Sequence, residues 1–239
     1  MNIRPYVIIN GVSSQAITGL LVTKLPPISK PLQRVLQEEI DGKDGDIITP
    51  LGYSAVDKPL EIALTKDYDV DEVINYFDSE GVITFSNEPD KYYRFKIFDQ
   101  IDFEKLIRFK TATVNIHCQP FKYSNIEQEL VFNISQNPTN IKINNAGNYN
   151  ARPVITIKGS GNATLSLNGS QVLLIAFGDV SQTIIIDSEK MNAYGLDNTL
   201  LNRLVTGDYD KIRLKTGANT FTISGAVTEF KIKNYSRWK

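Results

Sequence analysis

The chain has 239 residues, with 26 basic and 27 acidic side chains and a formal net charge of −1. This balance argues against a protein that binds nucleic acid along a broad basic surface, because neutralising phosphates needs an excess of Lys and Arg. One cysteine and one histidine exclude a disulfide framework, a cysteine zinc cluster and a His-rich metal site. No apolar run approaches the roughly 20 residues that a membrane-spanning helix needs, so we expect a globular protein made in a cytoplasm.

Alternating apolar residues predict strands in the first part of the chain. A tight turn at Asn10-Gly11 predicts a short hairpin. Further strands are expected at 17–25, which stops at Pro26-Pro27, and at 34–40 and 59–65.

The segment 41–54 lies between two of these strands and is expected to form an arm with its turn at 42–45. Four apolar residues crowd it: Ile47, Ile48, Leu51 and Tyr53. A two-stranded arm cannot bury such side chains by itself. Either the arm folds back on its own core, or a neighbouring molecule covers it, since an apolar tip left in water favours aggregation.

One helix is predicted at about 70–79. Asp69 and Glu72 have the spacing of a capping box, in which Asp69 accepts from the first turn and Glu72 reaches back. Apolar residues at 70, 73, 74 and 77 form one stripe. Gly81 is expected to end the helix in a left-handed conformation.

Two period-two stretches follow and predict a half-buried antiparallel sheet. In the first, the inward residues are Tyr93, Phe95, Ile97, Ile101 and Phe103. In the second, they are Ala112, Val114, Ile116 and Cys118.

The composition changes near residues 123–128. Asparagine occurs 5 times up to residue 124 and 15 times from 125 onward, which places a domain boundary here and predicts domains 1–124 and 125–239. The second half shows only short strands separated by turn residues, a pattern typical of a β-sandwich. The predicted strands are 131–135, 154–158, 163–167, 172–177, 183–187, 220–224 and 229–233.

Catalysis has few candidates. His117 and Cys118 are adjacent, but neighbours on a strand point to opposite faces and cannot meet over one substrate atom. The glycine-containing segments 41–46 and 159–161 lack the context of a phosphate loop or a nucleophile elbow. We therefore expect no catalytic residues and no cofactor.

A calcium loop is the strongest metal candidate, because Asp67, Asp69 and Asp71 resemble the start of an EF-hand. Its sixth position, which should be glycine, is Glu72, and helix capping explains these acids equally well. We therefore expect no metal site.

Sugar binding is a more serious alternative, since β-sandwiches often bind saccharides on an aromatic platform. The candidates are Trp238, near the C-terminus, and Tyr149, Tyr194 and Tyr209. A tyrosine in a strand domain is more often a packing residue.

Together, these segments resemble the distal tail protein (Dit) family of non-contractile phages that infect Gram-positive bacteria. No single motif is specific, but their order and spacing along the whole chain are. The segments are the turn at Asn10-Gly11, DGKDG (41–45), the helix 70–79, GVITFSNEPD (81–90), Tyr92-Tyr93, CQPFKY (118–123), NAG (145–147), ARPVI (151–155) and Arg237-Trp238.

The resemblance implies a mainly β protein. Its N-terminal domain would be β-sandwich-like, with one α-helix and a protruding β-hairpin arm, and a C-terminal galectin-like β-sandwich would follow. The N-terminal domain would form a hexameric ring at the distal end of the tail in the virion. The implied partners are the major tail protein, the tail-associated fibre or lysin hub protein and, as a further candidate, a receptor-binding protein. DNA would only pass through the channel, and no membrane insertion is expected.

By position, the arm would embrace the next subunit. Its interface residues would be Lys43, Asp44, Asp46, Ile47, Ile48, Leu51 and Tyr53. The sequence lacks the His-Asn-Arg and Trp constellation of sugar-binding galectins, so a galectin-like fold would not imply galectin activity. A structural hub is the first hypothesis, a lectin-like adhesion module the alternative, and a hydrolase the third.

Overall fold

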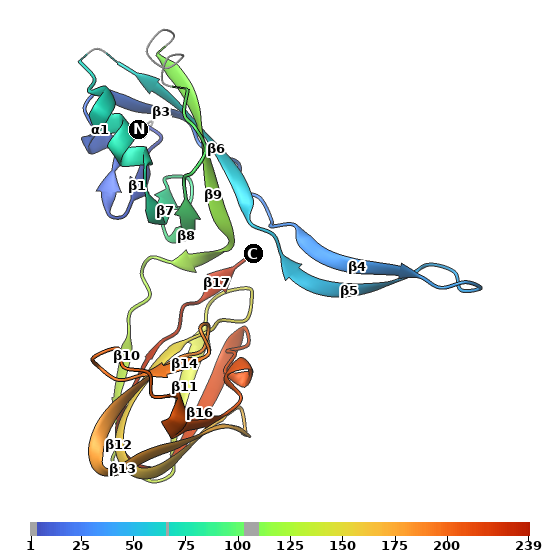
Figure 1. Cartoon of the computed structure of the whole chain (residues 1–239), viewed down its shortest axis with the longest axis vertical. Coiled ribbons are helices and arrows are strands. Elements are labelled where there is room, and N and C mark those ends of the chain that lie inside the picture. Colours follow the sequence, from blue (N-terminus) through green and yellow to red (C-terminus); the bar gives the residue numbers. More distant parts are fainter. Residues whose placement is uncertain (1–3, 66, 103–109) are drawn as a thin grey trace. The chain divides into compact units, whose positions relative to one another are not determined.

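The computed structural model describes residues 4–65, 67–102 and 110–239. The chain divides into two compact units, one up to Asn125 together with Lys239, the other from Ile126 to Trp238 (Figure 1). Each unit buries its own cluster of apolar side chains, and nearly all regular structure is antiparallel strand. The prediction of a mainly β protein with sandwich-like packing is confirmed.

The first unit contains one α-helix among its described residues and an antiparallel sheet in the order β2-β1-β7-β8-β9-β6-β3. Two further strands, β4 and β5, pair only with each other. The elements are β1 (Val7–Ile9), β2 (Val12–Ser13), the 3₁₀ turn η1 (Ser14–Ala16), β3 (Leu20–Lys24), β4 (Gln33–Glu39), β5 (Asp46–Tyr53), β6 (Val56–Leu64), α1 (Val70–Phe77), β7 (Glu80–Phe85), β8 (Lys91–Lys96) and β9 (Thr111–Ser124).

The helix α1 packs its apolar stripe into the core of this unit. Val73 and Phe77 are fully buried in the same cluster as the inward side chains of the sheet. The hydroxyl of Tyr76 donates to the carbonyl oxygens of Val7 (3.2 Å) and Val12 (3.1 Å), which ties the helix to the first hairpin. Burial raises the pKa of Tyr76.

Both ends of α1 depart from the prediction. Asp69 caps the helix as expected, accepting from the amides of Asp71 and Glu72. The Glu72 carboxylate, however, accepts from the Thr18 amide at 3.2 Å instead of reaching back. The helix ends at Phe77 and not near 79, and Gly81 lies inside β7. A Cβ on Gly81 would lie 2.2 Å from the side-chain oxygen of Asn10, so the glycine makes room for a hairpin side chain rather than ending the helix.

Two other predicted strands in this unit are shorter than expected. The predicted strand 17–25 begins only at Leu20, because η1 and a turn precede it. The inward alternation of 93–103 ends as a strand at Lys96, although Ile97 and Ile101 are buried; Phe103 lies outside the described residues. On β9, Cys118 is buried as predicted.

The second unit is built from strands alone, apart from short 3₁₀ turns, in its described residues. Its elements are β10 (Leu130–Asn133), β11 (Thr139–Asn145), β12 (Val154–Leu167), β13 (Ser170–Asp187), β14 (Asn192–Tyr194), η2 (Asn202–Leu204), β15 (Val205–Gly207), η3 (Tyr209–Lys211), β16 (Gly217–Lys233) and β17 (Arg237–Trp238). The central order is β10-β16-β12-β13-β14, with β11 on β16 and β15 on β13.

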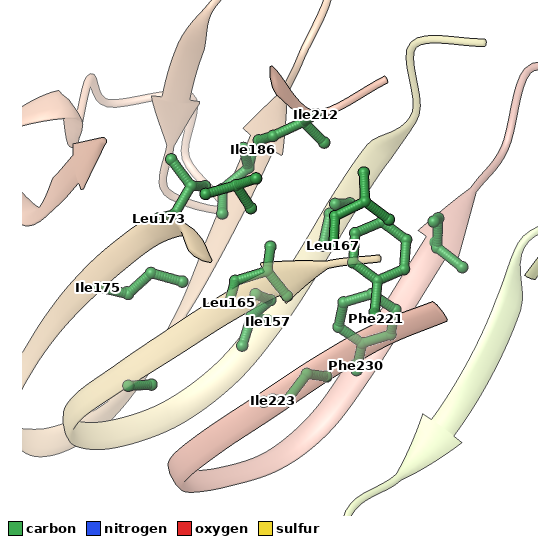
Figure 2. Close-up of a cluster of buried hydrophobic side chains, with 14 of the residues drawn as sticks. Ile157, Leu165, Leu167, Leu173, Ile175, Ile186, Ile212, Phe221, Ile223 and Phe230 are labelled. Carbon is green, nitrogen blue, oxygen red and sulfur yellow. The ribbon is translucent and has the colours of Figure 1, made fainter. Parts of the chain in front are cut away.

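Three long strands, β12, β13 and β16, pass through both layers of this unit. The first half of β16 pairs with β11 and its second half with β10, while the two halves of β13 pair with β15 and β14. Register shifts at Gly159–Asn162 on β12 mark the bend between the halves. Figure 2 shows the strands curving around the buried side chains, which include Leu165, Phe221 and Phe230.

The breaks predicted between neighbouring strands at these bends are therefore wrong, because the chain bends there within one strand. The pairs 154–158 with 163–167, 172–177 with 183–187, and 220–224 with 229–233 are each one continuous strand. Gly159, Gly178 and Gly225 lie where the strands bend. Gly225 has φ +110°, and a Cβ there would lie 2.3 Å from the carbonyl oxygen of Asn162, so glycine allows the strands to approach closely at the bend.

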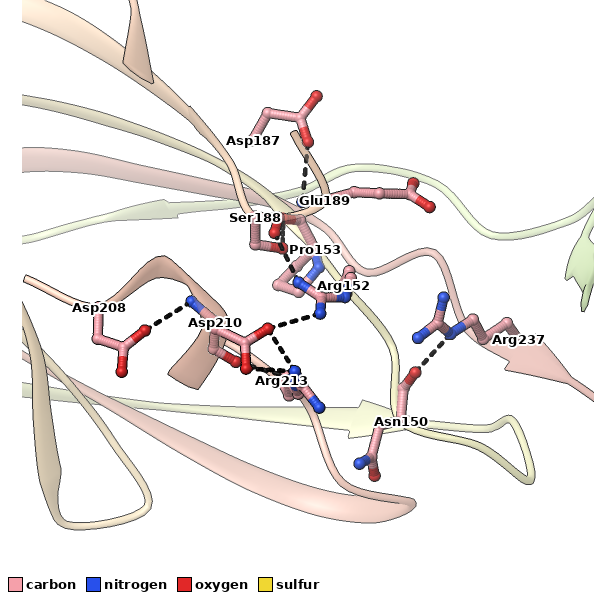
Figure 3. Close-up of polar contacts among 10 residues, drawn as sticks. All are labelled: Asn150, Arg152, Pro153, Asp187, Ser188, Glu189, Asp208, Asp210, Arg213 and Arg237. Carbon is pink, nitrogen blue, oxygen red and sulfur yellow. Dashed lines mark hydrogen bonds and ion pairs between the residues drawn. The ribbon is translucent and has the colours of Figure 1, made fainter. Parts of the chain in front are cut away.

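Polar side chains hold the loops at one end of the second unit (Figure 3). Asp210 accepts from Arg213 and also from Arg152 (2.7 Å), and these hydrogen bonds lower its pKa to about 2. Arg152 in addition donates to the Ser188 carbonyl oxygen at 3.0 Å. The network joins three separate stretches of chain at this end of the unit.

Candidate assembly surface

The strands β4 and β5 form a hairpin that is a sheet of its own. Cross-strand partners run from Gln33–Tyr53 at the base to Glu39–Asp46 at the far end. The turn 40–45 is closed by a hydrogen bond from the Lys43 amide to the Ile40 carbonyl oxygen (3.1 Å), and two glycines in it have positive φ. Figure 1 shows β4 and β5 as a ribbon that leaves the sheet of the first unit. We call residues 33–53 the arm; it begins earlier in the chain than the predicted 41–54.

Aliphatic side chains stand exposed on both faces of the arm. Because side chains alternate along a strand, Val35 and its partner Pro50 share a face with Ile48, whereas Leu36 and Ile47 lie on the other. Their exposed fractions run from 39% for Ile47 to 58% for Ile48. A sheet in water normally exposes one polar face and covers the other. The arm covers neither, so its own chain does not fold back over it.

Exposed apolar residues of the first unit are concentrated here. Of the eleven large hydrophobic side chains exposed among its described residues, seven lie at positions 32–51. They are Leu32, Val35, Leu36, Ile40, Ile47, Ile48 and Leu51. Exposed apolar side chains gathered on one element are a common feature of surfaces that bind another molecule.

The far half of the arm is also acidic. Between residues 38 and 46 the chain has five carboxylates and one basic side chain, Lys43. These charges keep the arm in solution and oppose edge-to-edge pairing of two arms, since like charges would then face each other. A partner surface for the arm would combine apolar area with basic groups.

The base of the arm is fixed to the first unit. The Ser54 amide donates to the Leu32 carbonyl oxygen (2.9 Å), and the ring of Tyr53 packs edge-on against Phe121, with centroids 5.5 Å apart. Tyr53 is therefore half-buried in its own unit. The other predicted interface residues lie in the turn (Lys43 and Asp44) or on β5 (Asp46, Ile47, Ile48 and Leu51), and all are exposed.

The sequence-based interpretation missed the half of the apolar surface that lies on β4. Val35 and Leu36 are 42% and 47% exposed and face the same directions as the β5 side chains. Counting outward from the turn in antiparallel register would have paired them with Pro50 and Thr49. The β-bulge at Leu51, which has no cross-strand partner, breaks that register near the base.

The thiol–imidazole pair does not converge on one site. Cys118 is fully buried, and burial raises the pKa of its thiol to about 12. His117 lies on the other face of β9, with its Nδ1 atom 2.7 Å from an Asp57 carboxylate oxygen on the neighbouring strand. The prediction that the two side chains point to opposite faces is confirmed.

The metal and sugar candidates can also be placed. The Asp69 carboxylate binds amides of the helix, and no group of three metal-ligating side chains occurs among the described residues. In the second unit, a hollow of about 340 Å³ lies over β12, β13 and β16. Its lining includes Thr164, Leu174 and Arg203 but no aromatic side chain, so it offers no stacking platform for a sugar.

Each of the three candidate tyrosines contacts another part of the protein. The Arg237 guanidinium lies over the ring of Tyr149 at 5.2 Å, the Tyr194 hydroxyl accepts from Asn192 at 3.2 Å, and Tyr209 packs against the core. In the described part of the chain, no helix is long and apolar enough to span a bilayer.

No protein-family model and no curated protein matches the chain. Among solved structures, it is similar to the crystal structure of the Dit protein (gp 19.1) of SPP1, described as a paradigm of the hub adsorption apparatus in phages that infect Gram-positive bacteria. The TM-score is 0.66 at 18% sequence identity, and the match covers 96% of this chain and 98% of that one. The similarity therefore concerns the fold and spans nearly the full length of both proteins. In its fold, the chain is a Dit-like protein.

Proposed function

We propose that this protein is a structural hub of a phage tail tip and has no catalytic role. Six copies form a ring at the distal end of the tail, with the major tail protein on one side and the tail-associated fibre or lysin protein on the other. A receptor-binding protein is a further candidate partner, and DNA passes through the channel. The observation that carries the proposal is the full-length likeness in fold to a hub adsorption protein.

The arm supplies an independent physical argument for assembly. A two-stranded ribbon with aliphatic side chains exposed on both faces gains stability when a second surface covers it. In this proposal the arm of each copy binds a different part of the next copy around the ring, which is a head-to-tail contact. Contacts of this kind close into rings when the rotation per subunit divides a full turn. A permanent interface buries on the order of 2,000 Å² or more.

The lectin-like alternative has less support. A saccharide site on a sandwich needs ring faces for stacking, and the hollow over β12, β13 and β16 is lined by aliphatic, hydroxyl and amide side chains with one arginine. Binding of the purified protein to host cell-wall saccharide would favour this alternative.

A shortened arm tests the proposal. Leu36 and Thr49 are cross-strand partners and both have an amide N–H that can close a turn, so residues 37–48 can be replaced by Asn-Gly, a turn suited to two-residue hairpins. We expect the unmodified chain to form hexamers by light scattering and electron microscopy, and the shortened chain to stay monomeric with an unchanged thermal midpoint. The control, Val12→Ser with Val82→Ser, removes exposed aliphatic side chains outside the arm and should assemble normally.

Two results would contradict the proposal at different points. Normal hexamers from the shortened chain would show that the arm is not part of the interface. An unmodified chain that stays monomeric at every concentration, and that binds no tail protein, would contradict the hub role itself.

A further inference from the structure

Lys58 is a lysine on the core face of β6. The strand alternates, and Leu60, Ile62 and Leu64 point inward on the same side as Lys58. Lys58 itself is 3% exposed. Lysine is almost never buried this deeply without a polar partner, because its amine must give up its hydration.

The partner of Lys58 is the main chain that leads into the arm. Its Nζ atom donates to the carbonyl oxygen of Pro27 at 3.1 Å and lies 4.9 Å above the ring of Tyr93. The preceding carbonyl, that of Pro26, accepts from the Asn87 side-chain amide at 3.2 Å. Prolines have no N–H to donate to a sheet, so carbonyl oxygens are the only main-chain groups by which these two residues can be held.

This bond joins the two stretches of chain at the base of the arm. Pro27 precedes Leu32 by five residues, and Lys58 follows Ser54 by four. Leu32 and Ser54 are themselves hydrogen-bonded across the base. The chain entering the arm is thus tied to the strand that the arm continues into, at a partly buried point outside the ribbon itself.

The surroundings of Lys58 favour a lasting hydrogen bond. Burial lowers the pKa of Lys58, the nearby Glu88 carboxylate acts in the opposite direction, and Lys122 acts in the same direction as burial. Glu88 is itself held by Lys122 at 2.7 Å in a largely buried ion pair. The Lys58 amine donates hydrogen bonds whether it is charged or neutral, so the link to Pro27 holds in either state.

We propose that Lys58 is the positioning residue of the arm: it fixes the direction in which the arm leaves the first unit and therefore whether a head-to-tail assembly closes. The inference rests on the proposed role of the arm in assembly. A head-to-tail contact gives a closed ring only for a defined rotation between neighbours. An arm that pivots at its base would give open chains and mixed oligomers, and its affinity would fall with the fraction of time spent in the competent direction.

Distance measurements on the monomer test the direction of the arm without reference to assembly. Spin labels are placed at Lys43→Cys in the turn and Thr113→Cys on β9, both exposed positions; buried Cys118 should stay unlabelled. We expect a narrow distance distribution in the otherwise unsubstituted chain and a clearly broader one after Lys58→Met. The matched control is Lys24→Met, which removes an exposed ion pair with Glu61 and should leave the distribution narrow.

Assembly of the unlabelled variants gives the second measurement. If the freed arm is competent about a tenth of the time, the concentration for half-assembly rises about tenfold and ring size becomes mixed, with Lys24→Met unchanged. Should Lys58→Met fail to fold, Lys58→Gln takes its place, because its polar side chain is shorter than that of lysine and its amide ends short of the position from which Nζ contacts the Pro27 carbonyl oxygen. A broad distribution in the unsubstituted chain overturns the inference. So does a folded variant, Lys58→Met or its substitute, that keeps a narrow distribution and normal rings. An unsubstituted chain that never assembles counts against the proposed function instead.

Discussion

The arm and the long strands of the second unit are both antiparallel ribbons with apolar side chains, yet these side chains are exposed in the arm and buried in the second unit. β12, β13 and β16 bury one face against another layer and lie between neighbours on both edges, whereas β4 and β5 have neither a third strand nor a facing layer. Two strands alone are marginal in water, and a third strand or a packed face makes them stable. The comparison teaches that apolar residues in a strand predict burial but do not say whether the covering surface belongs to the same molecule.

Removing a core side chain of the sandwich should have the largest effect. Phe230 is fully buried on β16 and packs on Phe221, with ring centroids 5.5 Å apart. Phe230→Ala leaves a cavity that neighbouring strands cannot fill, and we expect it to lower the free energy of unfolding by about 3–5 kcal/mol. Denaturant unfolding followed by circular dichroism measures this.

The matched control for that variant is Leu196→Ala in the same unit. Leu196 is 74% exposed, so the change should stay within about 0.5 kcal/mol. Equal losses from both variants would mean that the second unit is not stabilised by the buried cluster.

The bends in the long strands offer a sharper pair of variants. Gly225 and Gly178 both have positive φ, but a Cβ at Gly225 would meet the Asn162 carbonyl oxygen, whereas one at Gly178 has nothing within 4 Å. Gly178→Ala should cost about 1–2 kcal/mol from backbone strain alone. Gly225→Ala adds overpacking and should cost on the order of 3 kcal/mol or more. Thermal unfolding distinguishes them, and equal midpoints would mean that close approach at the bend is unimportant.

The loop network around Asp210 should matter less and should depend on pH. Hydrogen bonds from Arg213 and Arg152 lower the Asp210 pKa from 3.8 to about 2. A carboxylate with a depressed pKa stabilises the fold above its unfolded pKa and loses that contribution as the pH falls through its folded value. Asp210→Asn should therefore cost about 0.5–1 kcal/mol near neutral pH, a modest figure because the side chain is 46% exposed.

The pH series is itself the control for Asp210→Asn. The difference between the two proteins should be constant from pH 7 to about pH 5 and should shrink from about pH 4 toward pH 2. A difference that persists unchanged at pH 2 would mean that Asp210 acts through packing and not through its charge.

Local patterns predicted much of the fold, and their failures have physical causes. Period-two alternation placed the core faces of β8 and β9, and the capping residue Asp69 marked the start of the helix. The bends were misread because glycine serves equally in a turn and in a bulged strand, and only cross-strand register tells them apart. The strand β11 was missed because its exposed positions are asparagine and lysine, although Ile141 and Ile143 alternate inward.

The residues of the arm and its base also fall into two groups: those that local sequence patterns indicate, and those that depend on contacts with distant parts of the chain. Ile47, Ile48 and Leu51 stood out because their neighbours are turn residues and charges, so a local reading was enough. The β4 half of the apolar surface and the bond from Lys58 to Pro27 depend on pairings across 13 to 31 residues of chain. The sequence contains one signal for the bond from Lys58. This lysine occupies an inward position of an alternating strand whose other inward residues are apolar.

The smallest expected effect on monomer stability is also the most informative about the comparison. Ile48 and Leu51 are 58% and 55% exposed, so Ile48→Ser and Leu51→Ser remove little buried area from the monomer and should change its free energy of unfolding by less than about 0.5 kcal/mol. If a neighbour covers them, each loses an apolar contact worth about 1.5–3 kcal/mol when fully buried, which corresponds to roughly tenfold or more in assembly affinity. Unfolding at a concentration that keeps the chain monomeric, together with sedimentation at higher concentrations, separates the two quantities.

A large loss of monomer stability would mean that the arm is covered by its own chain. Unchanged assembly would mean that these two side chains meet no partner, and the contrast with the sandwich would then need another cause.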